Sequence, residues 1–474
     1  MSEVLLALVN VVATPLIVAG LGSQRYGFLG VVAVLSGQFG IFQLGLGPAA
    51  TRLIAECRHD DLGRRRGLTA ATALLGLASG GVLALLFSLF ASRLTGLVAH
   101  GRDAAALASS AALPMSLLFA LQPLEAALQG VLGGDSRFEL LASIKLGNGV
   151  AKLLATVVAV ELGGDVPAVL WLQATVELAT VAGLFAVIGP RACVARRRDL
   201  ASAARLVLQL GVPLAAAQML SGILADAEKL VLAAYRSLSD VAHYTAPFNA
   251  ASRVNVFAAA LATVIMPRVA SLAMRDGGAA AAQLTRRASR GITAAMTLAL
   301  SPLIALAPEL LRVWVGGEFE AAATLPIRIV LVGIVANTAA YLSHAALLAR
   351  ARPLTLPILY ALEAALHVPI VLVCVARWGV VGAALAWTIR VVIDAAAHRL
   401  LAGRVLGDRV ASALESWAPL GATAMLVVAF TCWPALAWPL RLAASLVVAL
   451  AVGARMGGLR DWLAQLRAFS AARS

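Results

Sequence analysis

The sequence predicts an all-α polytopic membrane protein with about fourteen transmembrane helices, and three observations support this fold class. The chain is 61% hydrophobic and only 13% charged, whereas about a quarter of the residues of a soluble protein carry charge. Its apolar runs have the length of about 20 residues that a helix needs to cross a bilayer. Arginines cluster in every second gap between these runs: Arg52, Arg58, Arg64, Arg65 and Arg66; then Arg191, Arg196, Arg197, Arg198 and Arg205; then Arg268, Arg275, Arg286, Arg287 and Arg290.

The alternation of basic gaps also predicts the orientation of the chain. Basic loops of polytopic proteins stay on the cytoplasmic side, so we expect an inner-membrane protein with both termini in the cytoplasm. The formal net charge of +14 would suggest a nucleic-acid partner in a soluble protein. Here the basic residues lie at helix ends, beside anionic lipid headgroups. Membrane lipids are therefore expected partners and nucleic acid is not.

The individual helices follow from the apolar runs, measured against a span of about 20 residues. Basic gaps follow the even-numbered spans, which fixes their direction. The predicted spans are 4–22, 27–47, 68–92, 104–131, 139–161, 166–189, 207–234, 241–266, 291–312, 323–349, 354–376, 379–400, 417–435 and 438–456.

An internal repeat organises these spans. When the chain is shifted by about 218 positions, similar features coincide at similar places in the spans. Six spans per repeat give both copies the same orientation, which predicts two six-helix lobes related by a pseudo-two-fold axis along the membrane normal. The matched pairs are Tyr26 with Tyr244, Pro48 with Pro267, Leu124 with Leu342, Gly163 with Gly379, and Glu177 with Asp394.

The predicted domains follow from the repeat. An N-lobe covers 1–190, a basic cytoplasmic linker 191–206 and a C-lobe 207–404. Two extra helices within 405–456 lie outside the duplication, and 457–474 forms a cytoplasmic tail with the pattern of an amphipathic helix. Two similar lobes that face each other would enclose a central cavity, the usual place of cargo in a transporter.

Charged residues inside the seventh and eighth spans form the clearest candidate site. Asp226 and Lys229 lie three residues apart on one helix face, and Arg253 lies mid-run between Asn249 and Asn255. A charge at membrane depth is costly unless it is paired or hydrated. Two interpretations remain open: an ion pair that holds helices together, or a cationic lining for an anionic cargo in which Asp226 tunes the cations.

Further ionisable residues in the spans are weaker candidates. Glu177 and Asp394, which the repeat matches, are candidates for ion coupling or charge pairing. The lone histidines His344 and His367 are more typical of core residues than of proton carriers. The other ionisable residues within predicted spans are Glu125, Lys145, Arg328, Glu363 and Arg390.

Motifs of other functional classes are absent from the sequence. It has no phosphate-binding loop, no zinc-protease motif and no nucleophile elbow, so we expect no catalytic residue, no metal, no cofactor and no enzymatic activity. Its four cysteines are far apart, which makes a disulfide framework unlikely in a protein with cytoplasmic loops.

The second span and its exit, GLGSQRYGFLGVVAVLSGQFGIFQLGLGPAATRLIAE from Gly20 to Glu56, resemble the start of the bacterial polysaccharide flippases. In this family of Wzx-like O-antigen and exopolysaccharide translocases, a Tyr-Gly pair, a Gly-Leu-Gly and a Thr-Arg are usual; here they are Tyr26-Gly27, Gly45-Leu46-Gly47 and Thr51-Arg52. The segment GVVGAALAWTIR, from Gly379 to Arg390, is similar to the family's twelfth span. One departure is Gln43, where the family often has an acid. The family belongs to the superfamily of multidrug exporters and the lipid II flippase.

The resemblance implies a flippase that moves a polyprenyl-pyrophosphate-linked oligosaccharide by alternating access, with a polysaccharide polymerase and glycosyltransferases as possible partners. Lys229 and Arg253, with Asn249 and Asn255, are then the expected cargo contacts. The alternatives are a cation-coupled multidrug exporter of the same fold, a lipid II flippase, and a membrane-embedded glycosyltransferase or polymerase. The first would favour an acidic cavity, yet the first two spans contain no acid; the last would need large outside loops, which are short here.

Overall fold

The computed structural model describes residues 2–57, 61–98, 102–190, 194–275, 279–350, 355–405 and 417–455. The predicted amphipathic tail, 457–474, lies outside the described residues, as do residues 191–193 of the predicted linker.

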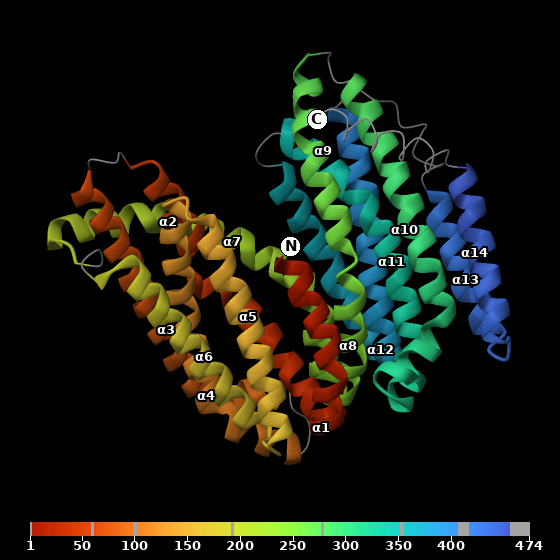
Figure 1. The fold of residues 1–474 in the computed structure, drawn as a ribbon, viewed down its shortest axis with the longest axis horizontal. Coiled ribbons are helices and arrows are strands. Elements are labelled where there is room, and N and C mark those ends of the chain that lie inside the picture. The colour runs from red at the N-terminus through yellow and green to blue at the C-terminus, as the bar shows by residue number, and fades with distance from the viewer. Residues whose placement is uncertain are drawn as a thin grey trace. The chain divides into compact units, whose positions relative to one another are not determined.

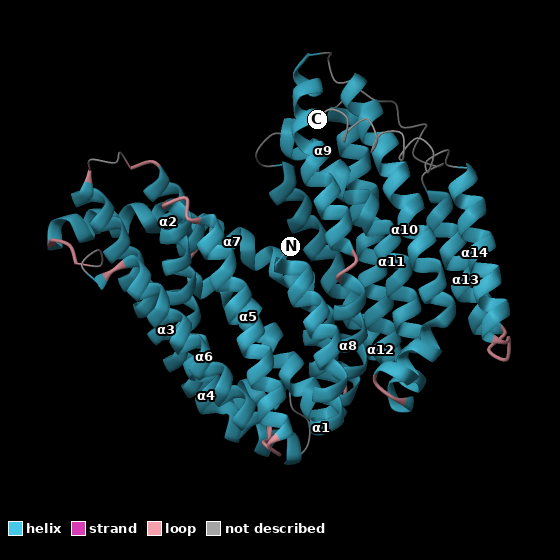
Figure 2. Cartoon of the chain, in the orientation of Figure 1, coloured by secondary structure: helices cyan, strands magenta, loops and turns pink. Residues whose placement is uncertain are grey.

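The described part of the chain is helical and contains no strand (Figure 2). It forms fourteen α-helices and one short 3-10 helix, η1 (Figure 1). Their bounds are α1 Ser2–Gln38, η1 Phe39–Gln43, α2 Leu46–Ala55, α3 Leu62–Val98, α4 Arg102–Gly134, α5 Phe138–Glu161, α6 Val166–Ile188, α7 Arg197–Tyr235, α8 Leu238–Ser252, α9 Asn255–Arg275, α10 Ala279–Trp314, α11 Gly317–Arg350, α12 Thr355–Val405, α13 Ala418–Cys432 and α14 Trp438–Arg455.

The predicted fold class is confirmed: eleven helical stretches in the described residues are long and apolar enough to cross a membrane. Two of them, in α1 and α12, each hold two predicted spans joined through a kink. The kinks lie at Gly22 (φ 79°) and Gly379 (φ 53°), where the left-handed backbone favours glycine. With the shorter apolar helix α13, these segments account for every predicted span. The chain is a multi-pass membrane protein.

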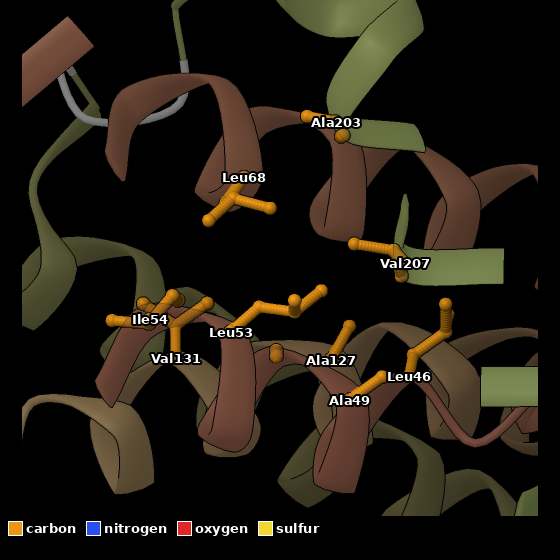
Figure 3. Packing of buried hydrophobic residues seen from close by; sticks show 11 residues of the cluster. Leu46, Ala49, Leu53, Ile54, Leu68, Ala127, Val131, Ala203 and Val207 are labelled. Atoms are coloured by element: carbon orange, nitrogen blue, oxygen red, sulfur yellow. The ribbon is translucent and has the colours of Figure 1, made fainter. Parts of the chain in front are cut away.

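The chain divides into two compact units, unit 1 (1–242) and unit 2 (243–474). This division falls later than the predicted lobe boundary at 207, because α7 packs against α1, α2 and α3 of unit 1. Figure 3 shows part of the unit 1 core, in which Leu46 and Leu53 of α2 meet Leu68 of α3, Val131 of α4 and Val207 of α7. The assignment of six-helix lobes stays a prediction.

The order of helix packing is the same in the two units. In unit 1, α4 packs against α2, α3 and α6. In unit 2, α11 packs in the same way against α9, α10 and α12. Gly163 (φ 74°) and Gly379 (φ 53°), matched by the repeat, both occupy the turn before the last helix of a set. These correspondences agree with the internal repeat in the sequence.

The two helices outside the repeat, α13 and α14, pack against α10 of unit 2. Arg328 of α11 is 5% exposed and donates through Nε to the Ile304 carbonyl at 3.0 Å. Its guanidinium also lies 5.6 Å from the centre of the Phe430 ring on α13. Arg441 of α14 pairs with Glu309 of α10. These contacts stabilise the buried guanidinium of Arg328, which indicates a structural role.

The Gly-Leu-Gly motif is a close-packing site. Gly45 has φ 59°, and a Cβ there would lie 2.2 Å from the Gly211 carbonyl oxygen of α7. At Gly130 of α4, a Cβ would lie 2.3 Å from the Gly47 carbonyl oxygen. The motif thus lets α2 approach both α4 and α7 at backbone distance.

We expect Gly45→Ala to lower the free energy of unfolding by about 2–5 kcal/mol, because left-handed backbone strain adds to overpacking against α7. The measurement is membrane abundance and the thermal unfolding midpoint of the purified protein. Gly183→Ala is the matched control, since a Cβ there meets nothing within 4 Å. Equal stability of the two variants would contradict the packing role of Gly45.

Candidate functional site

The second and eighth predicted spans are both broken within the span. In unit 1 the helix stops at Gln38, and η1 and the left-handed Leu44 and Gly45 follow before α2 begins. In unit 2 a turn at Arg253 and Val254 separates α8 from α9. Broken helices at membrane depth occur where backbone is buried in protein or lines a hydrated cavity, and in transporters they mark binding sites.

The residues predicted to contact cargo in unit 2 gather at its helix break. Arg253 and Asn249 are exposed, and Asn255 is half-buried. The side chain of Asn255 accepts a hydrogen bond from Asn337 Nδ2 of α11 at 3.4 Å. Arg253 thus places an exposed guanidinium in the middle of a span. A charge at that depth is costly unless it faces water or an anionic partner.

The structure brings Asp226 and Lys229 together in unit 1. Lys229 Nζ donates to Asp226 Oδ1 at 2.7 Å, with side-chain exposures of 11% and 22%. The end of α1 lies beside this pair, since Gln38 Nε2 donates to the Gly222 carbonyl of α7 at 2.9 Å. The predicted ion pair therefore exists, and Lys229 is buried apart from a small exposed fraction.

Glu177 belongs to a polar cluster of unit 1, which we call cluster 1, and its other members are half-buried: Glu125 of α4, and Asn148 and Lys152 of α5. Glu177 is 0% exposed and pairs with Lys152. Asn148 Nδ2 donates to Glu125 Oε1 at 2.8 Å and to Glu177 Oε2 at 3.3 Å. Glu125 Oε1 also accepts from Gln129 at 2.8 Å.

Asp394 belongs to a second buried cluster, in unit 2, which we call cluster 2: His344 of α11, Tyr360 and Glu363 of the first half of α12, and Asp394 and His398 of its second half. Asp394 Oδ1 lies 2.8 Å from His398 Nδ1. His398 Nε2 lies 3.2 Å from His344 Nδ1, which is 3.4 Å from the Tyr360 hydroxyl. A carboxylate oxygen of Glu363, a carboxylate oxygen of Asp394 and a ring nitrogen of His398 lie within 4.8 Å of one another.

Reasoning from the sequence identified Glu177 and Asp394 but missed their partners Lys152 and His398. Lys152 could have been predicted, because it lies in the middle of an apolar run. Lys145 of the same helix, which was named as a weaker candidate, is exposed. His398 lies near a span end, where a histidine carries little information. His344, expected to be a core residue, contacts His398.

The fold is that of two solved polytopic membrane proteins, MurJ and a MATE family member. The chain is similar in fold to "Lipid II flippase MurJ, inward closed conformation", with a TM-score of 0.74 at 12% identity, covering 98% of each chain. A "multidrug resistance MATE family transporter of the MOP superfamily" in its inward-facing conformation gives a TM-score of 0.67 at 15% identity, over 85% of this chain and 94% of that one. At these identities the similarity shows the fold alone.

The chain belongs to the family described as "Polysaccharide biosynthesis protein", whose profile matches residues 1–273. A Shigella flexneri protein named "Putative O-antigen transporter" is 22% identical over 395 residues, which are 79% of this chain and 89% of that protein. The family resemblance predicted from the sequence motifs is confirmed.

Proposed function

We propose that this protein is an inner-membrane flippase that translocates a polyprenyl-pyrophosphate-linked oligosaccharide by alternating access. Membership of the polysaccharide biosynthesis family supports this function, and so does the similarity to an O-antigen transporter. The observation that carries the proposal is Arg253: an accessible cation at a helix break in the middle of an apolar span.

The physical task is to move a polar sugar and a charged pyrophosphate past hydrocarbon. Lys229 and Arg253 are proposed to contact the pyrophosphate or an acidic sugar, because charge-assisted hydrogen bonds to phosphate are strong. Asn249 and Asn255 are proposed to donate and accept hydrogen bonds with sugar hydroxyls. The lipid tail can remain in the bilayer while the polar part moves.

The acids have a different proposed role. Asp226 holds Lys229 in place, and Glu177 and Asp394 serve ion coupling or charge pairing. The expected partners are the lipid-linked oligosaccharide and membrane lipids, with a polysaccharide polymerase and glycosyltransferases acting beside the flippase. The protein is proposed to catalyse no covalent step.

The test is deletion of the gene in its own host, followed by complementation. We expect surface glycan to fall by about tenfold or more. Lipid-linked oligosaccharide should accumulate on the cytoplasmic side of the inner membrane. The complemented strain should recover both values. Unchanged surface glycan with increased sensitivity to cationic drugs would instead identify a multidrug exporter, and accumulation of lipid II would identify a lipid II flippase.

Two native cysteines can test the proposed topology. Cys57 follows α2 in a basic gap, and Cys432 is exposed at the end of α13. With both termini in the cytoplasm, Cys57 should lie on the cytoplasmic side and Cys432 on the periplasmic side. In single-cysteine variants, a membrane-impermeant maleimide should label Cys432 in intact spheroplasts, and Cys57 only in inverted vesicles.

The reaction at Cys57 should depend on pH. Partial burial raises the pKa of the Cys57 thiol, more than the nearby Arg64 guanidinium lowers it. Less thiolate is then present at neutral pH, so labelling should be slow and rise about tenfold per pH unit below the pKa. Buried Cys374 is the unlabelled control. Labelling of Cys57 in intact spheroplasts would refute the orientation.

A further inference from the structure

Clusters 1 and 2 occupy the same place in the internal repeat. Each lies among the fourth, fifth and sixth spans of its set: α4, α5 and α6 in one case, and α11 with the two halves of α12 in the other. Glu177 and Asp394, which the repeat matches, are the central acids of the two clusters. The duplication therefore allows the surroundings of the two central acids to be compared.

The two clusters differ in the group that contacts their central acid: Lys152 in cluster 1 and His398 in cluster 2. In cluster 1, the Lys152 ammonium pairs with Glu177, and Glu125 accepts hydrogen bonds from two amide side chains at 2.8 Å. A lysine is a fixed cation in such a pair, because losing its proton would leave a buried carboxylate unpaired. The central acid of cluster 1 thus has a permanent counter-charge.

Cluster 2 has no lysine in the described residues, and an imidazole contacts its central acid. His398 is 2% exposed and bridges Asp394 and His344 through its two ring nitrogens. Imidazole is the side chain whose ordinary titration falls in the physiological range. Glu363 is 4% exposed, and neither of its carboxylate oxygens has a hydrogen-bond partner in the part of the chain that the structure describes.

We propose that cluster 2 is an exchangeable proton site. In its counterpart, cluster 1, Lys152 is a fixed cation that keeps Glu177 ionised. A proton shared by Glu363, Asp394 and His398 takes the place that the lysine ammonium holds in cluster 1. When the site loads, a proton from water forms an O–H bond on Glu363 or Asp394; when it unloads, that bond breaks and the proton returns to water. This proposal deepens the proposed function, since it assigns ion coupling to Asp394 rather than to Glu177.

The donor set favours a proton over a metal ion. Hard cations such as Na⁺ prefer oxygen ligands, whereas His398 supplies a nitrogen. A transition metal accepts imidazole, but the Nδ1 atom that faces Asp394 is already at hydrogen-bond distance, 2.8 Å. Every member of the chain Asp394, His398, His344 and Tyr360 is a group that gains or loses a proton.

The groups around the site come from every helix that contributes to it. Arg390 of α12 is the permanent cation near Glu363 and Asp394. Tyr341 and His344 face Asp394 from α11, and Tyr360 faces it from the first half of α12.

The test measures protonation directly on the purified full chain in lipid nanodiscs, so it needs no cargo. Infrared difference spectra taken from about pH 5 to about pH 8 should show a carboxylic C=O band that titrates. The band should be lost in Glu363→Gln or Asp394→Asn, and it should persist in the matched cluster 1 variant Glu177→Gln. His398→Lys, which supplies a fixed cation, should abolish the titration while preserving the folded protein.

Several results would overturn the proposal. They are a titrating band that survives in both cluster 2 variants, a band that disappears in Glu177→Gln, and displacement of the proton by Na⁺ or Zn²⁺ at constant pH. If a carboxyl variant fails to fold, His344→Gln serves instead and should shift the titration midpoint; an unchanged midpoint counts against the proposal. If the protein exports glycan but shows no titrating band, the proton site is refuted while the proposed flippase function stands.

Discussion

Replacing Lys229 by alanine is expected to reduce glycan export at least about tenfold at normal protein abundance, because a charge-assisted hydrogen bond of about 1.5–3 kcal/mol is lost. Arg253→Ala should have the same effect. Lys229→Arg should retain most export, since the positive charge remains within reach of the pyrophosphate. The measurement is surface glycan beside membrane abundance in the complemented deletion strain.

A purely structural role of the ion pair makes a different prediction. Lys229 Nζ lies 2.7 Å from Asp226 Oδ1, so removing the lysine would leave that acid without its partner, and abundance should fall. The double variant Asp226→Asn with Lys229→Gln should then restore both abundance and export. Full export by the Lys229→Ala, Arg253→Ala double variant at normal abundance would remove both residues from the proposed cargo site.

The membrane-spanning architecture could be predicted from the sequence because lipid imposes a simple rule: every span must be long and apolar. The helix breaks could not be predicted, because the residues at Phe39–Gln43 and Arg253 belong to runs that remain apolar overall. Such breaks depend on tertiary packing, here of α2 against α4 and α7. The Gly-Leu-Gly motif gave a family resemblance, but its packing role required Gly211 and Gly130, which lie far away in the sequence.

The polar clusters show the same limit at the level of single residues. An acid deep in a span is visible as an exception to the hydropathy, so Glu177 and Asp394 were found. A partner is defined by which helices meet, and no periodicity indicates that α5 places Lys152 against α6. The internal repeat matches Glu177 with Asp394. It therefore relates cluster 1 to cluster 2, although it does not identify the partners of either acid.

The second large effect is expected at Lys152 in cluster 1. Lys152→Met should lower the free energy of unfolding by about 3–5 kcal/mol, the usual cost of leaving a buried acid unpaired. Glu177 is 0% exposed, so its charge cannot be rehydrated without opening the contact between α5 and α6. The lysine side chain is 28% exposed, which places the expected value at the lower end of that range.

The measurement is the thermal unfolding midpoint of the purified protein, with membrane abundance beside it. The double variant Lys152→Met with Glu177→Gln should recover most of the stability, because a neutral amide is less costly to bury than an unpaired charge. Lys145→Met on the same helix is the control, since Lys145 is exposed and its loss should leave the midpoint unchanged. If Lys152→Met is as stable as this control, then Lys152 does not act as the fixed cation of cluster 1, and the contrast with cluster 2 loses its physical basis.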